Sequence, residues 1–271
     1  AFERIKFPKY SAIITIKYNH ILKYMCNHLC KEGKVYFVEE GVGEYLCGNE
    51  NDIIEEQNIH KYVGGRYLLL PELAVENQRV KVYRNPYLNQ GKEFNDLLKS
   101  FFKCDKEIKL YSRIIFFDQP YKRDYNYDNY DLIVKNVFDE LQQTFSLKDI
   151  CIKAHPRTEK CQSKIKTIYG TSPWECLIGE MEDINDRLLI SLTSTAVITP
   201  KILCNKEPYV IVLIYFMYSF YEQMENGSEI FNRDIKLFKY IQSIYKKDKF
   251  YIPTTIAEYR EVLKKIKENV V

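Results

Sequence analysis

The chain has 271 residues, of which 46% are hydrophobic and 28% are charged, and its formal net charge is +3. Such a length corresponds to one large or two small globular domains, and the apolar content excludes an intrinsically disordered chain. The near balance of charges argues against a dedicated nucleic-acid-binding protein, and the longest apolar run, residues 209–220, is too short for a membrane-spanning helix.

The first half of the chain alternates short runs of β-branched and aromatic residues with helical patterns, which is typical of α/β folds with parallel sheets. Strands are predicted at residues 11–16 and 34–38, with a helix at 19–30 between them. Residues 44 to about 102 show no regular pattern and contain a Gly–Gly pair. That stretch is expected to hold the crossover between two domains.

The second half follows a domain boundary predicted near residue 105 and has a clearer pattern of alternating strands and helices. The predicted strands cover residues 113–117, 149–154, 188–191 and 209–216, and the predicted helices cover 130–144, the residues after Pro173, those from 193 onward, and 256–268. These features indicate a doubly wound domain, in which ligands bind outside the carboxyl ends of the strands.

Polar clusters follow three of these predicted strands. They are Asp118-Gln119-Pro120, His155-Pro156-Arg157 and Thr193-Ser194-Thr195. Carboxyl ends of parallel strands meet at one edge of a sheet, so we expect these residues to lie near one another. Their convergence, more than any single motif, points to an active site.

His155 is the first candidate for chemistry. The following proline favours an extended backbone, so the imidazole is expected to leave the sheet at its carboxyl edge, with Arg157 on roughly the same side. An imidazole beside a guanidinium suits a phosphate-bearing group, because Arg supplies a fork of donors and His can donate a proton. The alternative is an ordinary surface histidine in a loop.

Ser194 and Thr195 lie between a predicted strand and a predicted helix. Small hydroxyl residues there cap the helix and present its first backbone N–H groups, which can bind an anion, although capping alone is the commoner role. Glu175 falls in the first turn of the helix after Pro173. It is expected either to interact with the helix dipole or to bind sugar hydroxyls.

Glu40 and Gly41 belong to an acidic turn directly after the second predicted strand. Two adjacent carboxylates, Glu39 and Glu40, can raise the pKa of one of them and so provide a general base near neutral pH. The alternative is a pair of solvated acids in a turn.

The eight cysteines form no Cys-x-x-Cys pair, and the one local cluster, Cys26 and Cys30 with His28 between them, has no second pair of ligands at a zinc-finger distance. We therefore expect reduced thiols in a cytoplasmic protein and no metal site. The chain begins at Ala1 without a signal-like segment, so either an N-terminal portion has been removed or the sequence is partial.

Familiar nucleotide motifs are absent from the sequence, which has no G-x-G-x-x-G, Walker loop, G-x-S-x-G or D-x-D. Residues 233–251 mix basic and aromatic side chains. This stretch is consistent with contact to an anionic membrane surface and, more simply, with a solvated helix face.

Five short motifs in a fixed order resemble those of the bacterial sialyltransferases of glycosyltransferase family 52, the lipooligosaccharide and capsule enzymes related to polysialyltransferases. They are V-E-E-G-V-G (38–43), F-F-D-Q-P (116–120), K-A-H-P-R (153–157), S-P-W-E (172–175) and S-L-T-S-T-A (191–196). The resemblance covers residues from about 35 to 215. Relatives commonly have aspartate in the acidic turn, where this chain has Glu-Glu-Gly.

The resemblance implies a GT-B-like α/β fold, with two Rossmann-type domains and a cleft between them. The N-terminal, acceptor-side domain at residues 1–105 would be incomplete in this chain, and residues 106–271 would bind the nucleotide sugar. The implied activity is metal-independent, inverting transfer of sialic acid from CMP-sialic acid to a terminal sugar, often galactose, of a capsular or lipooligosaccharide glycan.

The resemblance also implies roles for particular residues. His155 would assist departure of the CMP phosphate, Arg157 would lie near that phosphate, and Ser194 and Thr195 would contact it. Glu175 would face the ribose or base. Glu40, with Gly41 in the same turn, would be the acceptor base. Some relatives place the base where this chain has Tyr121, and Asp118 lies three residues earlier as the other candidate.

Two other functions stay open beside this one: a transferase of the same fold with another nucleotide-sugar donor, and a non-catalytic truncated paralogue. The expected partners are the donor and a glycan acceptor, without nucleic acid and without a cofactor. Peripheral contact with the inner face of the cytoplasmic membrane and a homodimer are further expectations.

Overall fold

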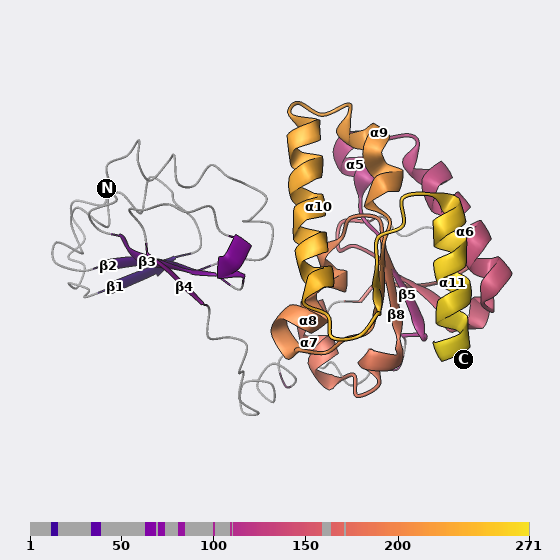
Figure 1. The fold of residues 1–271 in the computed structure, drawn as a ribbon, viewed down its shortest axis with the longest axis horizontal. Helices are drawn as coiled ribbons and strands as arrows, with labels where there is room; N and C mark the ends of the chain where they lie inside the picture. Colours follow the sequence, from indigo (N-terminus) through magenta and orange to yellow (C-terminus); the bar gives the residue numbers. More distant parts are fainter. Residues whose placement is uncertain are drawn as a thin grey trace. The chain divides into compact units, whose positions relative to one another are not determined.

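The computed structural model describes residues 12–15, 34–38, 63–68, 70–73, 81–84, 100, 109, 111–158, 164–170 and 172–270 of the chain. The chain divides into two compact units, Ala1–Leu88 and Asn89–Val271, and each is described by itself (Figure 1). Residues 101–108, where the domain boundary is predicted, lie outside the described part of the chain.

The first unit contains a four-stranded, all-parallel sheet. In order across the sheet its strands are β1 (Ala12–Thr15), β2 (Lys34–Val38), β3 (Val63–Leu68) and β4 (Val82–Arg84), and a 3₁₀ turn, η4 (Pro71–Leu73), lies between β3 and β4. Strands β1 and β2 confirm the two that the sequence predicts. The predicted helix at 19–30 and the acidic turn with Glu40 and Gly41 lie outside the described residues.

Strands β3 and β4 correct the prediction of an irregular segment at residues 44–102. The Gly–Gly pair, Gly64 and Gly65, lies inside β3, within the stretch where the sequence showed no regular pattern. The ring of Tyr36 on β2 lies against Gly64, and a Cβ at that position would be only 2.5 Å from the Tyr36 Cε1. Glycine is therefore needed here for close packing of neighbouring strands, a requirement that strand propensity does not show.

The second unit is a Rossmann-like α/β domain around a six-stranded, all-parallel sheet. Its strands are β5 (Ile114–Phe117), β6 (Ile150–Lys153), β7 (Lys166–Ile168), β8 (Leu188–Ser191), β9 (Tyr209–Val212) and β10 (Phe250–Tyr251). Helices α6 and α11 pack together on one face, and α7, α8 and α10 lie on the other (Figure 1). The α-helices are α5 (Tyr121–Tyr125), α6 (Tyr130–Thr144), α7 (Trp174–Glu180), α8 (Thr199–Cys204), α9 (Tyr218–Tyr221), α10 (Gly227–Ser243) and α11 (Ile256–Val270). Four 3₁₀ turns are interspersed: η6 (Leu147–Asp149), η7 (Ile184–Asp186), η8 (Thr195–Val197) and η9 (Ile214–Met217).

The strand order of this sheet is β10-β9-β8-β5-β6-β7. From β5 the chain first builds outward through β6 and β7, and then returns to the other side of β5 to add β8, β9 and β10. The order therefore reverses between β5 and β8, as in the doubly wound sheets that bind ligands at this point. The prediction of a doubly wound domain in this half of the chain is confirmed.

The individual predictions for this unit are mostly confirmed, including β5, β6, β8, α6, α11 and the helix after Pro173. The strand predicted at 209–216 is wrong in its second half, because β9 ends at Val212 and the buried turn η9 follows. Strand β8 ends at Ser191, opposite Val212, so no neighbouring strand continues beyond that residue. The single apolar run at residues 209–216 therefore covers a strand, β9, and most of a 3₁₀ turn, η9.

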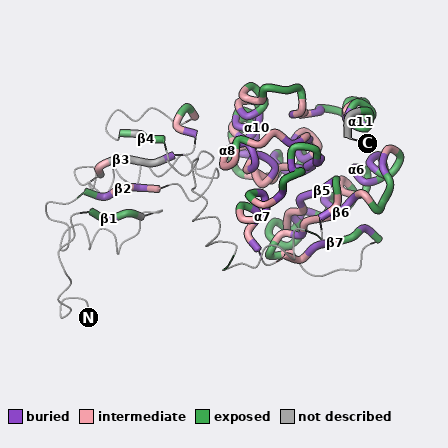
Figure 2. The backbone as a smooth tube through the Cα atoms, turned by 90° about the horizontal axis from the view of Figure 1, so that it is seen from below, coloured by how far each residue is buried: buried purple, intermediate pink, exposed green. Residues whose placement is uncertain are grey.

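The centre of the sheet is the hydrophobic core. Every residue of β5 and β8 is buried, and Figure 2 shows β5 as a buried strand among helices that have exposed residues on their outer sides. Strands covered on both faces have continuous apolar runs instead of alternating ones, as these do. This core fixes the positions of the strand ends and therefore the positions of the residues that follow them.

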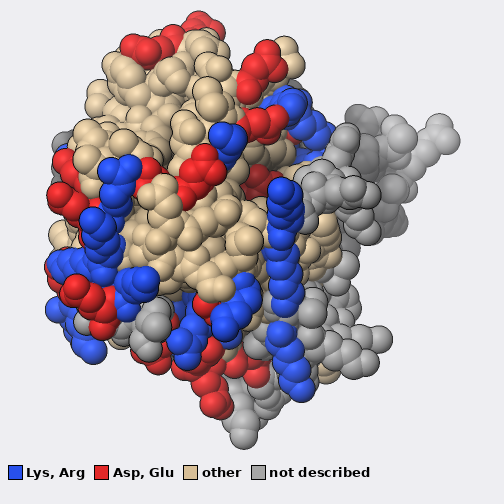
Figure 3. Space-filling view, turned by 90° about the vertical axis from the view of Figure 1, so that its right-hand side faces the viewer, with Lys and Arg blue, Asp and Glu red and all other residues tan. Residues whose placement is uncertain are grey.

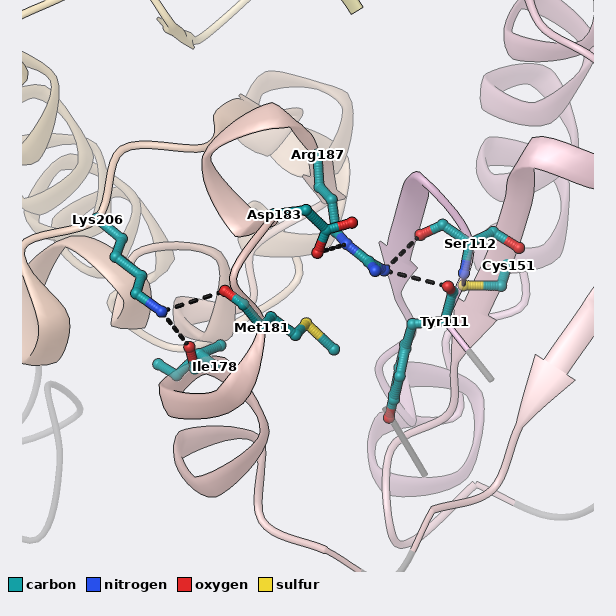
Figure 4. A network of polar contacts seen from close by, with 8 residues as sticks. All are labelled: Tyr111, Ser112, Cys151, Ile178, Met181, Asp183, Arg187 and Lys206. Atoms are coloured by element: carbon teal, nitrogen blue, oxygen red, sulfur yellow. Dashed lines mark hydrogen bonds and ion pairs between the residues drawn. The ribbon is translucent and has the colours of Figure 1, made fainter. Parts of the chain in front are cut away.

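A polar network joins the amino-terminal ends of β5 and β8 (Figure 4). Arg187, which precedes β8, is buried, and its Nη1 donates to the carbonyl oxygens of Tyr111 (3.1 Å) and Ser112 (3.0 Å), while its Nε donates to Asp183 (3.0 Å). Nearby, Lys206 Nζ donates to carbonyl oxygens at the end of α7, including that of Ile178 (2.9 Å). Arg187 and Lys206 thus donate hydrogen bonds to backbone carbonyl oxygens at the amino-terminal edge of the sheet, opposite the edge where the polar clusters follow the strands.

The surface on the α6 and α11 side mixes charges of both signs, as Figure 3 shows. Its ion pairs include Arg260 with Glu140, Lys265 with Asp248, and Lys135 with Asp139. Across the described residues, no helix combines the length and the apolar character required to cross a membrane. The predicted membrane contact of residues 233–251 stays a prediction.

Candidate functional site

The three polar clusters lie at one edge of the second sheet. Strand β5 is paired with β6 on one side and with β8 on the other, all parallel and in matched register, so the residues after Phe117, Lys153 and Ser191 leave the sheet together. Backbone bonds extend this pairing, since the Asp118 N–H donates to the Lys153 oxygen at 3.0 Å. The expected convergence of the three clusters at one edge is thereby confirmed.

Gln119 connects the tips of β5 and β8 at the reversal of strand order. Its Oε1 accepts hydrogen bonds from the hydroxyl of Thr193 (2.8 Å) and from the Thr193 backbone N–H (3.3 Å). The hydroxyl of Tyr121 also contacts the Thr193 Oγ1. Since Thr193 gives its own proton to Gln119, the Tyr121 hydroxyl is the donor in this pair.

Asp118 connects the tips of β5 and β6. Its Oδ1 accepts from the Tyr130 hydroxyl at 2.6 Å and its Oδ2 accepts from the Thr158 hydroxyl at 2.8 Å. Tyr130 also accepts from the Gln119 backbone N–H at 3.1 Å. Burial, followed by the charge of Asp118, raises the pKa of Tyr130 well above its usual value, so this hydroxyl keeps its proton as a donor.

Tyr121 is held in the same way. Burial raises its pKa far above the usual value of a tyrosine, and the ring packs edge-on against Phe220 of α9 with the ring centroids 4.7 Å apart. Its hydroxyl therefore acts as a hydrogen-bond donor and not as a base near neutral pH. Tyr121 is therefore not suited to act as a base in this chain.

His155 lies half-buried directly beyond β6. Its Nδ1 accepts the backbone N–H of Arg157 at 3.2 Å, so the proton of the neutral ring is carried by Nε2. Burial first, and the charge of Arg157 second, lower the pKa of His155 below its usual value, against the opposing effect of Asp124 and Asp118. At neutral pH this side chain is a neutral imidazole that offers an Nε2–H group.

The titration of His155 gives a first testable prediction. Its NMR-detected midpoint should lie below 6.5, and Arg157→Gln should raise it, because the variant removes a positive charge and leaves the opposing carboxylate of Asp124 unpaired. With a lowered pKa in the folded state, the unfolded chain binds more protons, so this group makes folding less favourable as the pH falls below 6.5. A midpoint above 6.5, or one that the substitution leaves unmoved, would contradict this account.

Arg157 is anchored to helix α5. Its Nη1 pairs with the Asp124 carboxylate at 2.6 Å, and its carbonyl oxygen accepts from Arg123 at 2.6 Å. The guanidinium is 60% exposed, so it keeps a surface open to solvent while Asp124 fixes its direction. Arg157 lies next to His155, as the sequence predicts, but it is paired with a carboxylate.

Ser194 and Thr195 open the turn η8. The Ser194 Oγ accepts the Ala196 N–H at 3.3 Å, and Trp174 Nε1 donates to the Ala196 carbonyl oxygen at 2.8 Å. The capping role that the sequence left open for Ser194 is thereby observed. The Thr195 carbonyl oxygen accepts from Thr199 at 3.3 Å, and phosphate contacts by Ser194 and Thr195 stay a prediction.

The remaining predicted residues are placed as follows. Glu175 lies in the first turn of α7, as expected, and is exposed. Glu40 and Gly41 fall outside the described residues, so their predicted roles stay predictions. Sequence reasoning missed Tyr130 and Thr158, because a tyrosine opening a helix and a threonine ending a turn carry no motif of their own.

Among the residues that the structure describes there is no candidate metal site, and the thiols of Cys151 and Cys204 are not activated. That part of the chain has no group of three or more His, Cys, Asp or Glu side chains that could hold a metal ion. Burial raises the pKa of the Cys151 and Cys204 thiols, so both are poor nucleophiles near neutral pH. The predicted cluster of Cys26, His28 and Cys30 lies outside the described residues.

The site therefore consists of a neutral imidazole and an exposed guanidinium beside a network of hydroxyl, carboxylate and amide groups at the carboxyl edge of a Rossmann-like sheet. The imidazole Nε2–H and the guanidinium can donate hydrogen bonds to an anionic or polyhydroxylated ligand. In comparisons of the chain with models of protein families and with curated proteins, no family model and no curated protein matched.

Proposed function

We propose that the protein is an inverting glycosyltransferase of GT-B type that moves sialic acid from CMP-sialic acid to a terminal sugar of a capsular or lipooligosaccharide glycan. The observation that carries the proposal is the meeting of the β5, β6 and β8 tips where the strand order reverses. Doubly wound sheets bind nucleotides at this point. The five ordered motifs supply the choice of donor.

In this proposal His155 binds the phosphate of CMP as it leaves. The Nε2–H of the neutral imidazole donates a hydrogen bond to a phosphate oxygen, and the negative charge that develops on the leaving phosphate strengthens this bond and raises the pKa of His155. Arg157 adds a positive charge beside it. These donors are preorganised by protein contacts and need little rearrangement during the reaction.

The acceptor hydroxyl must lose one proton in the same reaction. Glu40 and Asp118 are the two carboxylates that the sequence offers for this step. Asp118 lies at the described edge, with both oxygens already accepting hydrogen bonds from Tyr130 and Thr158. The first unit, which holds Glu40, is the acceptor side in this proposal.

A donor assay tests the function. The purified chain is incubated with CMP-sialic acid and a galactose-terminated acceptor, and release of CMP and sialylated product are measured. The proposal expects both. Turnover of a nucleotide-linked hexose instead, without release of CMP, would replace it by the alternative donor, and no turnover of either would favour the non-catalytic paralogue.

Binding of CMP gives a second and simpler test of the proposed function. A ligand present at 100 times its dissociation constant stabilises the folded state by about 2.7 kcal/mol, which should appear as a clear rise in melting temperature. Because a bound phosphate raises the pKa of His155, CMP should bind more weakly as the pH rises through the pKa of the bound state. Cytidine, which lacks the phosphate, should show no such pH dependence, and an unchanged melting temperature with saturating CMP would speak against the site.

A further inference from the structure

The residues beyond β6 form a tight turn that carries His155. The backbone N–H of Thr158 donates to the carbonyl oxygen of His155 at 2.8 Å, which closes the turn over four residues. Inside it, the Arg157 N–H donates to the His155 ring at 3.2 Å. The direction of the imidazole therefore depends on where this turn is held.

Two attachments hold the turn from outside. The first is the hydrogen bond of the Thr158 hydroxyl to Asp118 Oδ2 at 2.8 Å, directly beyond β5. The second is the contact of Arg157 with α5, through the carboxylate of Asp124 and through Arg123, which donates to the Arg157 carbonyl oxygen. Asp118 is itself fixed by the Tyr130 hydroxyl at 2.6 Å on its other oxygen. The buried end of α6 thus sets the position of Asp118, and Asp118 sets the position of the turn.

We propose that Asp118 is a positioning residue, which holds the His155 turn through Thr158 in the geometry needed for the leaving phosphate, and is not the base of the reaction. This inference rests on the proposed function. An acceptor base needs an oxygen that faces the acceptor hydroxyl within hydrogen-bond reach. In Asp118 each oxygen already accepts a strong hydrogen bond from a protein hydroxyl.

The electrostatic surroundings of His155 make its titration a sensitive reporter of the turn. The charged groups that act on the ring are Arg157 in its own turn, Asp124 on α5, Asp118 beyond β5, and Lys153 on β6. Burial is the largest of the effects on its pKa. If the turn is released from Asp118, the ring gains solvent, and its pKa should rise toward the usual value.

Thr158→Val separates positioning from base chemistry. The variant removes the hydroxyl but leaves the Asp118 carboxylate in place, so a base would still work. The positioning role expects kcat for CMP release to fall by about tenfold to a hundredfold, because a displacement of about 1 Å can cost that much. The KM for CMP-sialic acid should change far less, and the NMR midpoint of His155 should rise.

Two companion variants control the experiment. Thr158→Ser keeps a hydroxyl and should restore both kcat and the His155 midpoint. Thr167, on the neighbouring strand β7, has a hydroxyl that donates to the carbonyl oxygen of Ile165. Thr167→Val removes this hydroxyl and should change neither kcat nor the His155 midpoint. Combining Asp118→Asn with Thr158→Val should cost no more than the larger single loss, since the Asp118–Thr158 contact that Thr158→Val breaks is already disturbed in Asp118→Asn.

The possible outcomes separate this inference from the function on which it rests. Near-native kcat with an unmoved His155 midpoint in Thr158→Val would overturn the positioning role, as would losses that multiply in the double variant. If the native chain releases no CMP, the function fails. The His155 titration needs no substrate and then still tests the positioning role. A raised His155 midpoint in Thr158→Val that returns to the native value in Thr158→Ser supports the role, and an unchanged midpoint in Thr158→Val refutes it.

Discussion

His155→Ala should lower the turnover of CMP-sialic acid by about a hundredfold to ten-thousandfold, the range in which a positioned acid or base contributes to catalysis. The imidazole is the titratable donor that the β6 tip presents beside Arg157, and alanine removes the Nε2–H that would bind the leaving phosphate. Steady-state CMP release, measured with saturating donor, is the appropriate readout.

The variant should stay folded, because His155 is only half-buried, its ring bonds to the backbone N–H of nearby Arg157, and the bond from the Thr158 N–H to its carbonyl oxygen does not involve the side chain. Equal urea midpoints for variant and native chain would establish this. Lys122→Ala is a matched control at the same edge of the sheet: it breaks an exposed ion pair with Asp131 on α6 and should leave turnover unchanged. Turnover of His155→Ala within about threefold of native would remove the imidazole from the mechanism, since general acid–base help is worth about 10²-fold at least.

Arg187→Ala should destabilise the second unit by about 3 kcal/mol. The guanidinium is a charged donor to the carbonyl oxygens of Tyr111, in a buried bond, and of Ser112, in a part-buried one, and hydrogen bonds to charged groups contribute about 1.5–3 kcal/mol each. Its pair with Asp183, which is 57% exposed, adds little. After substitution the two oxygens lose their partner where water has poor access.

Urea unfolding measures this effect as a lower transition midpoint. Arg187→Lys should recover only part of the loss, because one ammonium on a different stem cannot reproduce the separate Nη1 donor to the two carbonyl oxygens and Nε donor to Asp183. Lys135→Ala, which breaks an exposed pair on α6, should leave the midpoint unchanged. The network lies at the amino ends of β5 and β8, so the CMP affinity of the folded fraction should be native. A loss below about 1 kcal/mol would mean that water replaces the guanidinium.

Sequence periodicity was sufficient for the core of the second unit. Strands such as β5 and β8 are buried on both faces and therefore consist of continuous apolar runs, while α6 has apolar residues at helical spacing. The same logic failed for β9, where one apolar run covers a strand and a buried turn, and for β3, where Gly64 packs against Tyr36.

The candidate site could be predicted only in part. Polar residues after a strand can be recognised from sequence, so Asp118, His155 and Ser194 were identified by position. Their hydrogen-bond partners could not be identified from the sequence. Thr158 and Tyr130 lie 40 and 12 residues from Asp118 and contact it only because β5 and β6 are neighbours and α6 returns to the same edge.

The sequence by itself determined the alternation of strands and helices, the apolar cores of the strands and the polar residues that follow them, because these depend on local periodicity and residue chemistry. The tertiary structure decided which strands are neighbours and, through that, that Gln119 bonds to Thr193 and Asp118 to Thr158. Strand order is set by burial of helix and sheet faces across the whole domain. No short segment encodes it.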